Sequence, residues 1–230
     1  MRTYLVTGGA GFIGSHLCET LLQNGCEVIA LDSLNDYYDV RIKEKNLQEI
    51  RQHCGAQQFQ FVHGDIRDMN MLKSIFSRNS IQDVIHLAAY AGVRPSIEEP
   101  RLYYDVNVMG TLNILECMKK YHVKKMLFAS SSSVYGNNKF VPFSEDHFVD
   151  QPISPYAATK KSNELMAHAY SKLYNIPSTG LRFFTVYGPA GRPDMAYFGF
   201  TNKLLNGATI KIFNYGNCKR DFTYVDDIVE

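Results

Sequence analysis

The sequence lacks the features that would direct a chain to a membrane, a nucleic acid or an oxidising compartment. No apolar run approaches the roughly 20 residues that a bilayer-spanning helix needs, and no signal-peptide pattern follows Met1-Arg2. A formal net charge of +1 over 230 residues gives no long-range attraction to nucleic acid or to an anionic membrane. We therefore expect a cytoplasmic protein with no nucleic-acid partner and no membrane span. The cysteines include no C-x-x-C pair and are expected to be free thiols; they are Cys18, Cys26, Cys54, Cys117 and Cys218.

Apolar, strand-like runs alternate along the chain with segments of helical periodicity. This alternation predicts an α/β fold, a doubly wound parallel (Rossmann-type) sheet with crossover helices. Most of the runs are almost continuously hydrophobic, which is typical of strands buried on both faces. The predicted strands are 3–7, 27–31, 58–63, 84–88, 125–130 and 179–184, and the predicted helices include 13–21, 69–76 with Asp68 as N-cap, 103–121 and 156–174.

The character of the sequence changes after residue 187. Loop-type residues over 188–195 precede a predicted helix at 198–205 and a predicted strand at 209–213, and the chain ends inside what looks like the start of a helix. We predict a dinucleotide-binding domain over 1–187 that also carries the catalytic residues. Residues 188–230 are expected to be the start of a smaller substrate-binding domain, cut short either by truncation or because the product is naturally short.

A glycine-rich turn between the first predicted strand and helix indicates a dinucleotide site. It satisfies G-x-G-x-x-G from Gly9 and G-x-x-G-x-x-G from Gly8, so the helix N-terminus can donate amides to a pyrophosphate. Asp32 follows the second strand, 18 residues after Gly14, where a carboxylate accepts from both ribose hydroxyls and repels a 2′-phosphate. The alternative for Asp32 is a simple cap, but the context favours NAD over NADP. The predicted cofactor contacts in this region are Gly8, Gly11, Phe12, Ile13, Gly14 and Asp32.

The ends of the third and fourth predicted strands are expected to hold the rest of the dinucleotide. Asp65 can reach the adenine amino group, although it can equally cap the next helix, and the two roles are compatible. Small residues after the fourth strand let the cofactor pass close to the backbone. The predicted contacts here are Asp65, Ile66, Leu87, Ala88 and Ala89, together with Asn107.

Tyr156 and Lys160 form a Y-x-x-x-K pair on one face of a predicted helix. A free tyrosine has a pKa near 10, and a neighbouring ammonium together with a bound nicotinamide ring favours the phenolate. The pattern alone is common in a chain with 15 tyrosines, and a solvated helix face is the alternative. Ser131, at the end of the fifth strand, can donate to a substrate oxygen and favours the catalytic interpretation. Ser130, Ser132 and Ser133 share its turn, where ordinary turn chemistry is the alternative.

These motifs resemble the extended branch of the short-chain dehydrogenase/reductases, the NAD-dependent nucleotide-sugar epimerases and dehydratases, over all 230 residues. Within that branch the chain is most similar to UDP-glucuronate 4-epimerases. The segments that carry this resemblance are 33–39 (SLNDYYD), 91–94 (AGVR), 181–189 (LRFFTVYGP), 191–195 (GRPDM) and 220–227 (RDFTYVDD).

The resemblance implies that Ser131, Tyr156 and Lys160 are the catalytic set and that NAD stays bound and is regenerated in each turnover. Tyr156 would take the proton of the sugar C4 hydroxyl while a hydride passes to NAD, and the 4-keto sugar would turn and receive the hydride on its other face. Dehydratase relatives carry an Asp-Glu pair after the catalytic hydroxyl. This chain has Ser132-Ser133 there, which argues against dehydration.

Oxidation of a glucuronate at C4 makes a β-keto acid, which loses carbon dioxide unless its carboxylate is held out of alignment with the carbonyl. Our hypothesis is that Ser132, Ser133 and Arg192 hold it, although Arg192 can equally bind the nucleotide diphosphate. Arg94 is a further predicted substrate contact. The chain departs from these epimerases at Tyr90, where glutamine is usual, at Pro95, where tyrosine is usual, and by ending at Glu230.

Several alternatives stay open from the sequence. The chain can be a UDP-glucuronate decarboxylase, a 4-epimerase of UDP-galactose, UDP-xylose or N-acetylated UDP-sugars, or a non-catalytic NAD-sensing or scaffold protein. The relatives commonly dimerise through two long helices, here 103–121 and 156–174, so a homodimer is expected by analogy. No metal site is predicted.

Overall fold

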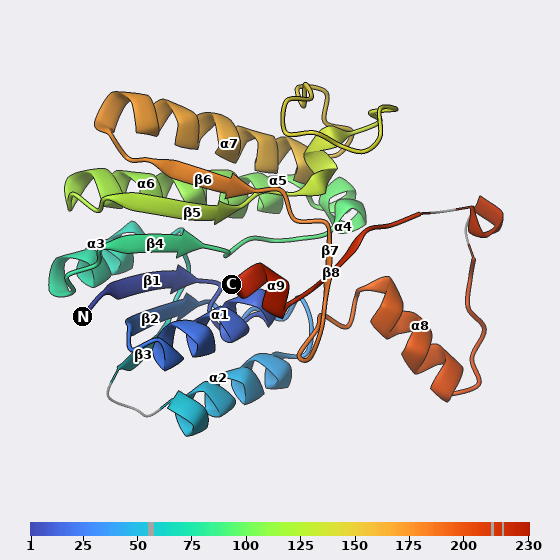
Figure 1. Ribbon diagram of the computed structural model, residues 1–230, viewed down its shortest axis with the longest axis horizontal. Helices are drawn as coiled ribbons and strands as arrows, with labels where there is room; N and C mark the ends of the chain where they lie inside the picture. Colours follow the sequence, from blue (N-terminus) through green and yellow to red (C-terminus); the bar gives the residue numbers. More distant parts are fainter. Residues whose placement is uncertain (55–57, 213, 218) are drawn as a thin grey trace.

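A computed structural model describes residues 1–54, 58–212, 214–217 and 219–230 of the chain. Six parallel strands form the main sheet in the order β3-β2-β1-β4-β5-β6 (Figure 1), which confirms the predicted doubly wound fold. The order reverses between β1 and β4, and the carboxyl ends of those two strands therefore open a crevice. The strands are β1 (Thr3–Thr7), β2 (Glu27–Asp32), β3 (Phe59–His63), β4 (Asp83–His86), β5 (Lys125–Ala129) and β6 (Ser178–Leu181).

Helices cover both faces of this sheet (Figure 1). Side chains alternate along each strand, so Leu5 of β1 packs against α3 (Met69–Arg78), α6 (Gly110–Lys120) and α7 (Pro155–Tyr174). Its neighbour Val6 packs on the other face, against α1 (Phe12–Gln23) and α2 (Val40–Cys54). Both residues are fully buried. The two hydrophobic cores fix the sheet between its helices and hold the carboxyl strand ends in place.

Helix ends follow local side-chain chemistry. Asp68 accepts hydrogen bonds from the amides of Asn70 and Met71, which confirms it as the N-cap of α3. Ser154 caps α7 in the same way by accepting from the Ala157 amide, with Pro155 at the first helical position. The predicted helix over 103–121 is divided into α5 (Pro100–Tyr103), a π-helical segment (Tyr104–Met109) and α6. The helices α2 and α4 (Val93–Glu98) were not predicted.

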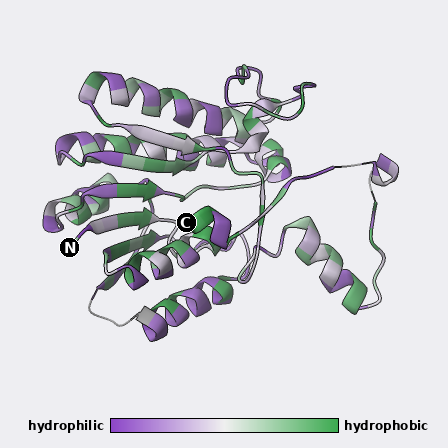
Figure 2. Ribbon diagram, in the orientation of Figure 1, coloured by the Kyte–Doolittle hydropathy of each residue, from purple (hydrophilic) through white to green (hydrophobic). Residues whose placement is uncertain are grey.

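Two predicted strands differ from the structure. The run 179–184 leaves the sheet after Leu181, where the Phe183 amide bonds back to the Leu181 carbonyl. The prediction of a strand at 209–213 is wrong over 209–212, which form no strand, while residue 213 lies outside the described part. This region follows α8 (Ala196–Leu205), which confirms the predicted helix but buries none of its side chains. Figure 2 shows hydrophobic residues in this projecting part of the chain.

The C-terminal residues return to the sheet domain. The parallel pair β7 (Thr185–Tyr187) and β8 (Phe222–Tyr224) brings α9 (Asp226–Val229) against α1. The division of the chain at 187/188 stays a prediction, although β7 and β8 pair across it. Among the described residues, none of the helices has the length and hydropathy required to cross a bilayer.

Three cysteine side chains can be assessed. Cys26 and Cys117 are free thiols, as expected, and Cys18 and Cys117 are buried. Cys218 and the side chain of Cys54 lie outside what the structure describes.

Candidate active site

A cleft of about 500 Å³ lies at the carboxyl ends of the strands, where the strand order reverses. It collects residues from the glycine-rich turn, the ends of β2, β4 and β5, and the first turns of α7. Nearly all of the predicted site residues line it. They are Gly8, Gly11, Phe12, Ile13, Gly14, Asp32, Asp65, Ile66, Leu87, Ala88, Ala89, Ser131, Ser132, Ser133, Tyr156, Lys160 and Arg192.

The glycine-rich turn brings α1 close to the end of β1. Gly8 adopts φ +73°, a conformation that other residues rarely adopt. At Gly14, an added Cβ would lie 2.1 Å from the Gly8 carbonyl oxygen, so only glycine fits there. The N-terminus of α1 borders the cleft at Gly11, Phe12 and Ile13, and a helix N-terminus in that place suits an anion.

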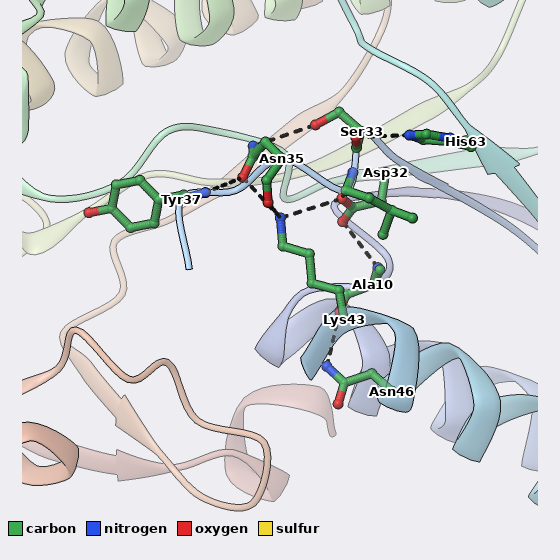
Figure 3. Close-up of polar contacts among 9 residues, drawn as sticks. Ala10, Asp32, Ser33, Asn35, Tyr37, Lys43, Asn46 and His63 are labelled. Carbon is green, nitrogen blue, oxygen red and sulfur yellow. Dashed lines mark hydrogen bonds and ion pairs between the residues drawn. The ribbon is translucent and has the colours of Figure 1, made fainter. Parts of the chain in front are cut away.

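Asp32 ends β2 with its carboxylate buried. Its Oδ2 accepts from the Ala10 amide at 3.2 Å, and its Oδ1 accepts from the Leu34 amide at 2.9 Å. The ammonium of Lys43, also buried, lies 3.8 Å from Oδ1 (Figure 3). Asp32 is thus oriented by two backbone donors and balanced by a cation that the sequence analysis did not single out.

Lys43 carries a signal that was available in the sequence. It lies on the same stripe of α2 as Leu47 and Ile50, both of which are buried. A lysine on the apolar face of an amphipathic helix needs a partner, because burial of an unpaired ammonium is costly. Burial lowers the pKa of Lys43, and the charge of Asp32 opposes that effect.

Asp65 already has a strong partner. Its carboxylate accepts from the Arg67 backbone amide at 2.8 Å and from two guanidinium nitrogens at 3.0 and 2.7 Å. Burial raises the pKa of Asp65, the Arg67 hydrogen bonds lower it, and the net shift is downward. Asp65 therefore closes a turn before α3, while its carboxylate remains on the lining of the cleft.

Tyr156 lies in the first turn of α7 and faces the cleft. Lys160, one turn later, donates to the Ala129 carbonyl at 2.8 Å, and its Nζ is 5.9 Å from the centre of the Tyr156 ring. Burial and then the charge of Arg192 lower the pKa of Lys160 to about 8. The predicted pair does share one helix face and one cavity.

The pKa of Tyr156 behaves differently from the sequence-based expectation. Burial raises it above the ordinary value, and this effect outweighs the lowering by a hydrogen bond with Ser131 and by the charge of Arg192. Among the protein's own groups, Arg192 supplies the opposing charge that was expected from Lys160. A phenolate at this position therefore needs more positive charge than the chain provides by itself.

The serine turn joins the end of β5 to a short 3₁₀ helix (Ser132–Tyr135). Ser131 caps that helix by accepting from the Ser133 amide at 3.1 Å, and the Ser132 amide donates to the Phe183 carbonyl at 2.9 Å. Ser130 donates to Glu164 at 2.6 Å, so its hydroxyl serves the turn, as the alternative interpretation held for at least one of these serines.

Glu164 and Arg182 form an ion pair behind this turn that was not predicted. Two hydrogen bonds of 2.9 and 3.1 Å join them, and Arg182 also donates to the Tyr135 hydroxyl at 3.1 Å. Glu164 follows Lys160 by four residues on α7, a spacing that puts both on one face and could have indicated its role.

Arg192 enters the cleft from the loop after β7. Its guanidinium binds Asp194 through bonds of 3.0 and 2.6 Å and lies 5.7 Å from the centre of the Tyr37 ring. Tyr90, one of the departures from the family pattern, also lines the cleft. Tyr37 and Asp194 are further lining residues that were not predicted.

Two predicted residues lie outside the lining. Asn107 is fully buried in the π-helical segment, where its side chain bonds to both backbone groups of Tyr90 and to Thr159 Oγ1. This amide joins the backbone of Tyr90 to Thr159 of α7 and so holds two elements together. Arg94 is exposed at the start of α4 and is not part of the lining.

The chain is similar to known proteins over nearly its whole length. The model of a family described as the NAD dependent epimerase/dehydratase family matches residues 4–230. Protein CapI of Staphylococcus aureus is 54% identical over 226 residues, which cover 98% of this chain and 66% of that protein. The UDP-glucuronate 4-epimerase of Thermodesulfobacterium geofontis is 51% identical over 228 residues, covering 99% of this chain and 69% of that protein. The chain therefore spans about two thirds of the length of these relatives.

Solved structures show the same fold. UDP-glucuronic acid 4-epimerase from Bacillus cereus, in complex with UDP-glucuronic acid and NAD, superposes with a TM-score of 0.91 at 40% identity. The match covers 99% of this chain and 71% of that chain. UDP-glucose 4-epimerase from Thermotoga maritima, with UDP-glucose, gives a TM-score of 0.88 at 37% identity, over 99% of this chain and 71% of that one.

Proposed function

The chain belongs to the NAD dependent epimerase/dehydratase family, and from that premise we propose that it is a nucleotide-sugar 4-epimerase that converts UDP-glucuronate to UDP-galacturonate with NAD. The observation that carries the proposal is the convergence of Ser131, Tyr156 and Lys160 in one cleft with the glycine-rich turn. A binding module for dinucleotides would not need those three side chains together. The names of the relatives, UDP-glucuronate 4-epimerase among them, support the choice of substrate.

The chain's own residues fit NAD. The N-terminus of α1 suits a pyrophosphate, and the buried carboxylate of Asp32 suits ribose hydroxyls more than a 2′-phosphate. NAD, when bound, supplies a hydride acceptor and, later in the cycle, a hydride donor. It also adds positive charge next to Tyr156, which the protein's own groups leave with a raised pKa.

Proton transfer is assigned to Tyr156. Its phenolate would take the proton of the sugar C4 hydroxyl while the C4 hydrogen leaves as a hydride, for which bound NAD would be the acceptor, and Ser131 would donate to the same oxygen. Lys160 is held on the Ala129 carbonyl, with its Nζ 5.9 Å from the centre of the Tyr156 ring. After the 4-keto intermediate has turned in the cleft, the hydride would return to the opposite face of C4 and Tyr156 would give the proton back to the C4 oxygen.

The carboxylate of the sugar is assigned to Ser132, Ser133 and Arg192, which all line the cleft. Hydroxyl and charge-assisted hydrogen bonds there keep the carboxylate out of alignment with the C4 carbonyl and so prevent loss of carbon dioxide. Replacing Ser132 and Ser133 with alanine should increase the share of pentose product. An unchanged product ratio would remove this assignment.

The proposal is tested by incubating the protein with NAD and UDP-glucuronate and separating the sugars by chromatography and mass. A product of unchanged mass that co-elutes with UDP-galacturonate is expected. A UDP-pentose as the main product would make the protein a decarboxylase. Calorimetric binding of NAD without binding of UDP or any UDP-sugar would make it a dinucleotide-binding protein only.

A cytoplasmic homodimer completes the proposal. The outer faces of the π-helical segment and of α7 expose apolar side chains that a second copy can cover, among them Met109, Leu165 and Leu173. Sedimentation of the wild-type protein should give a mass of two chains. The Leu165→Glu variant should sediment with the mass of a single chain. We also assign residues 188–230 to the nucleotide-sugar side of the site, because Arg192 comes from that part of the chain.

A further inference from the structure

The segment 33–39 (SLNDYYD) extends from the proposed cofactor side of the cleft to the proposed sugar side. It begins directly after Asp32 and includes Tyr37, which lines the cleft. The proposed function uses none of its side chains. Its contacts nevertheless join residues at the two ends of the cleft.

Lys43 fixes the middle of this segment. Its ammonium donates to both the carbonyl and the side-chain oxygen of Asn35, each at 3.0 Å, and the same side-chain oxygen accepts from the Tyr37 amide at 3.3 Å (Figure 3). The ammonium is itself buried, 3.8 Å from Asp32 and 5.0 Å from the centre of the Tyr38 ring. The backbone of Tyr37 is consequently held by the same cation that balances Asp32.

The ring of Tyr37 points away from this cluster, as Figure 3 shows. Its hydroxyl lies against Gly92, where an added Cβ would come within 2.6 Å of the oxygen. Gly92 also has φ +96°, so a side chain at this position would be strained as well as obstructed. Tyr90 meets the Tyr37 ring edge-to-face, with centroids 6.0 Å apart. The ring therefore has a defined place in the wall of the cleft.

The guanidinium of Arg192 lies over that ring, with Cζ 5.7 Å from its centre. This distance is within the range of a cation–π interaction, which strengthens as the pair is removed from water. Tyr37 is half-buried, and the Arg192 side chain is 25% exposed. Asp194 binds the same guanidinium through two hydrogen bonds. The Tyr37 ring and Asp194 together fix the position of the Arg192 guanidinium.

We propose that Tyr37 is a positioning residue that determines specificity: its ring, anchored through Asn35 and Lys43, holds the Arg192 guanidinium in place for the acidic group of the sugar. The inference rests on the proposed function, because it assigns Arg192 to the sugar carboxylate and not to the diphosphate. It predicts that removing the ring weakens recognition of an acidic UDP-sugar more than recognition of a neutral one.

The test compares the affinities of UDP-glucuronate and UDP-glucose for the NAD-saturated protein by titration calorimetry. In the wild type, UDP-glucuronate should bind more tightly. Tyr37→Leu should reduce that preference about fivefold or more, while Tyr37→Phe, which keeps the ring, should stay within about twofold of wild type. Tyr104→Leu is the matched control, because it removes an exposed tyrosine ring that is not part of the cleft lining and should leave the preference unchanged.

A double-mutant cycle shows whether Tyr37 acts through Arg192. Arg192→Ala should lose the preference, and adding Tyr37→Leu to it should change nothing further. The inference is overturned if Tyr37→Leu keeps the wild-type preference, if Tyr104→Leu loses it equally, or if both sugars weaken to the same extent. A wild-type protein that shows no preference for the acidic sugar would instead contradict the proposed substrate. Melting curves of each variant identify any loss that comes from unfolding.

Discussion

The guanidinium of Arg182 binds the carboxylate of Glu164 through two parallel hydrogen bonds, Nε to Oε1 at 2.9 Å and Nη2 to Oε2 at 3.1 Å. The pair supports the serine turn at both ends. Ser130 donates to Glu164, and the Ser132 amide donates to the carbonyl of Phe183, the residue next to Arg182. Ser131, the candidate catalytic hydroxyl, lies between these two anchored neighbours.

Loss of this pair should destabilise the fold. Glu164→Ala leaves the Arg182 guanidinium, whose side chain is only 20% exposed, without its main partner. We expect the free energy of unfolding to fall by about 2–3 kcal/mol, somewhat less than for a fully buried pair. Lys161→Ala is the control, because Lys161 lies 3.4 Å from the same carboxylate and its removal leaves the pair of Glu164 and Arg182 in place. Its cost should stay below about 1 kcal/mol in urea unfolding, and equal losses would contradict this account.

Tyr156→Phe should abolish most epimerisation without unfolding the protein. The phenol oxygen is the only group removed, and general acid–base catalysis contributes about 10²- to 10⁴-fold to a rate. We expect kcat to fall within that range while binding of NAD stays close to that of the wild type. Tyr174→Phe, at the exposed end of the same helix, should retain full activity. Turnover by the Tyr156→Phe variant within a few-fold of wild type would remove the proposed proton acceptor.

The buried imidazole of His86 should make the protein sensitive to acid. It bonds to the hydroxyls of Thr7 at 2.7 Å and Thr111 at 2.9 Å, and burial and then the charge of Lys160 lower its pKa to about 3. An unfolded histidine titrates near 6.5. As the pH falls from about 6.5 toward 3, the unfolded chain binds a proton that the folded one does not, so stability is lost.

The loss through His86 should approach about 1.4 kcal/mol per pH unit below pH 6. Urea unfolding of wild type and His86→Gln at pH 7, 5 and 4 checks this, because the variant lacks the titrating group. The stability difference between them should change in favour of the variant as the pH falls. His168→Gln, on the exposed side of α7, is the control and should follow the wild type. A difference that is independent of pH would show that His86 does not carry the acid sensitivity.

Gly14→Ala should disrupt the glycine-rich turn. The new Cβ would lie 2.1 Å from the Gly8 carbonyl oxygen and 3.0 Å from Gly9 Cα, and backbone atoms would have to move. We expect a loss of about 1–3 kcal/mol in stability together with much weaker NAD binding. Gly199→Ala in α8 has no atom within 4 Å of its Cβ and should be neutral or stabilising by up to about 1 kcal/mol. Thermal melting and NAD titration of both variants distinguish the two sites.

Local patterns in the sequence were enough to predict the sheet, its buried strands and the glycine-rich turn. Hydrophobic runs such as 27–31 predict strands that are buried on both faces of the sheet. A glycine pattern between a strand and a helix predicts a turn whose backbone can approach a dinucleotide closely. Asp32 and Ser131 could be predicted as site residues because they follow strands whose carboxyl ends meet at one edge of the sheet. Tyr156 could be predicted because it shares a helix face with Lys160. These features depend on residues that are close in the sequence or fixed by the topology.

Periodicity and spacing are local properties, and they were therefore enough to predict the fold and many of the residues that line the cleft. The partners of these residues became known only from the packed fold: Lys43 lies beside Asp32, Glu164 pairs with Arg182, and the Tyr37 ring lies under Arg192. The packed fold also placed Asn107 in a structural network and left 209–212 without a strand. Each of these depends on whether packing brings a complementary group from another element to within a few ångströms, which no local pattern encodes.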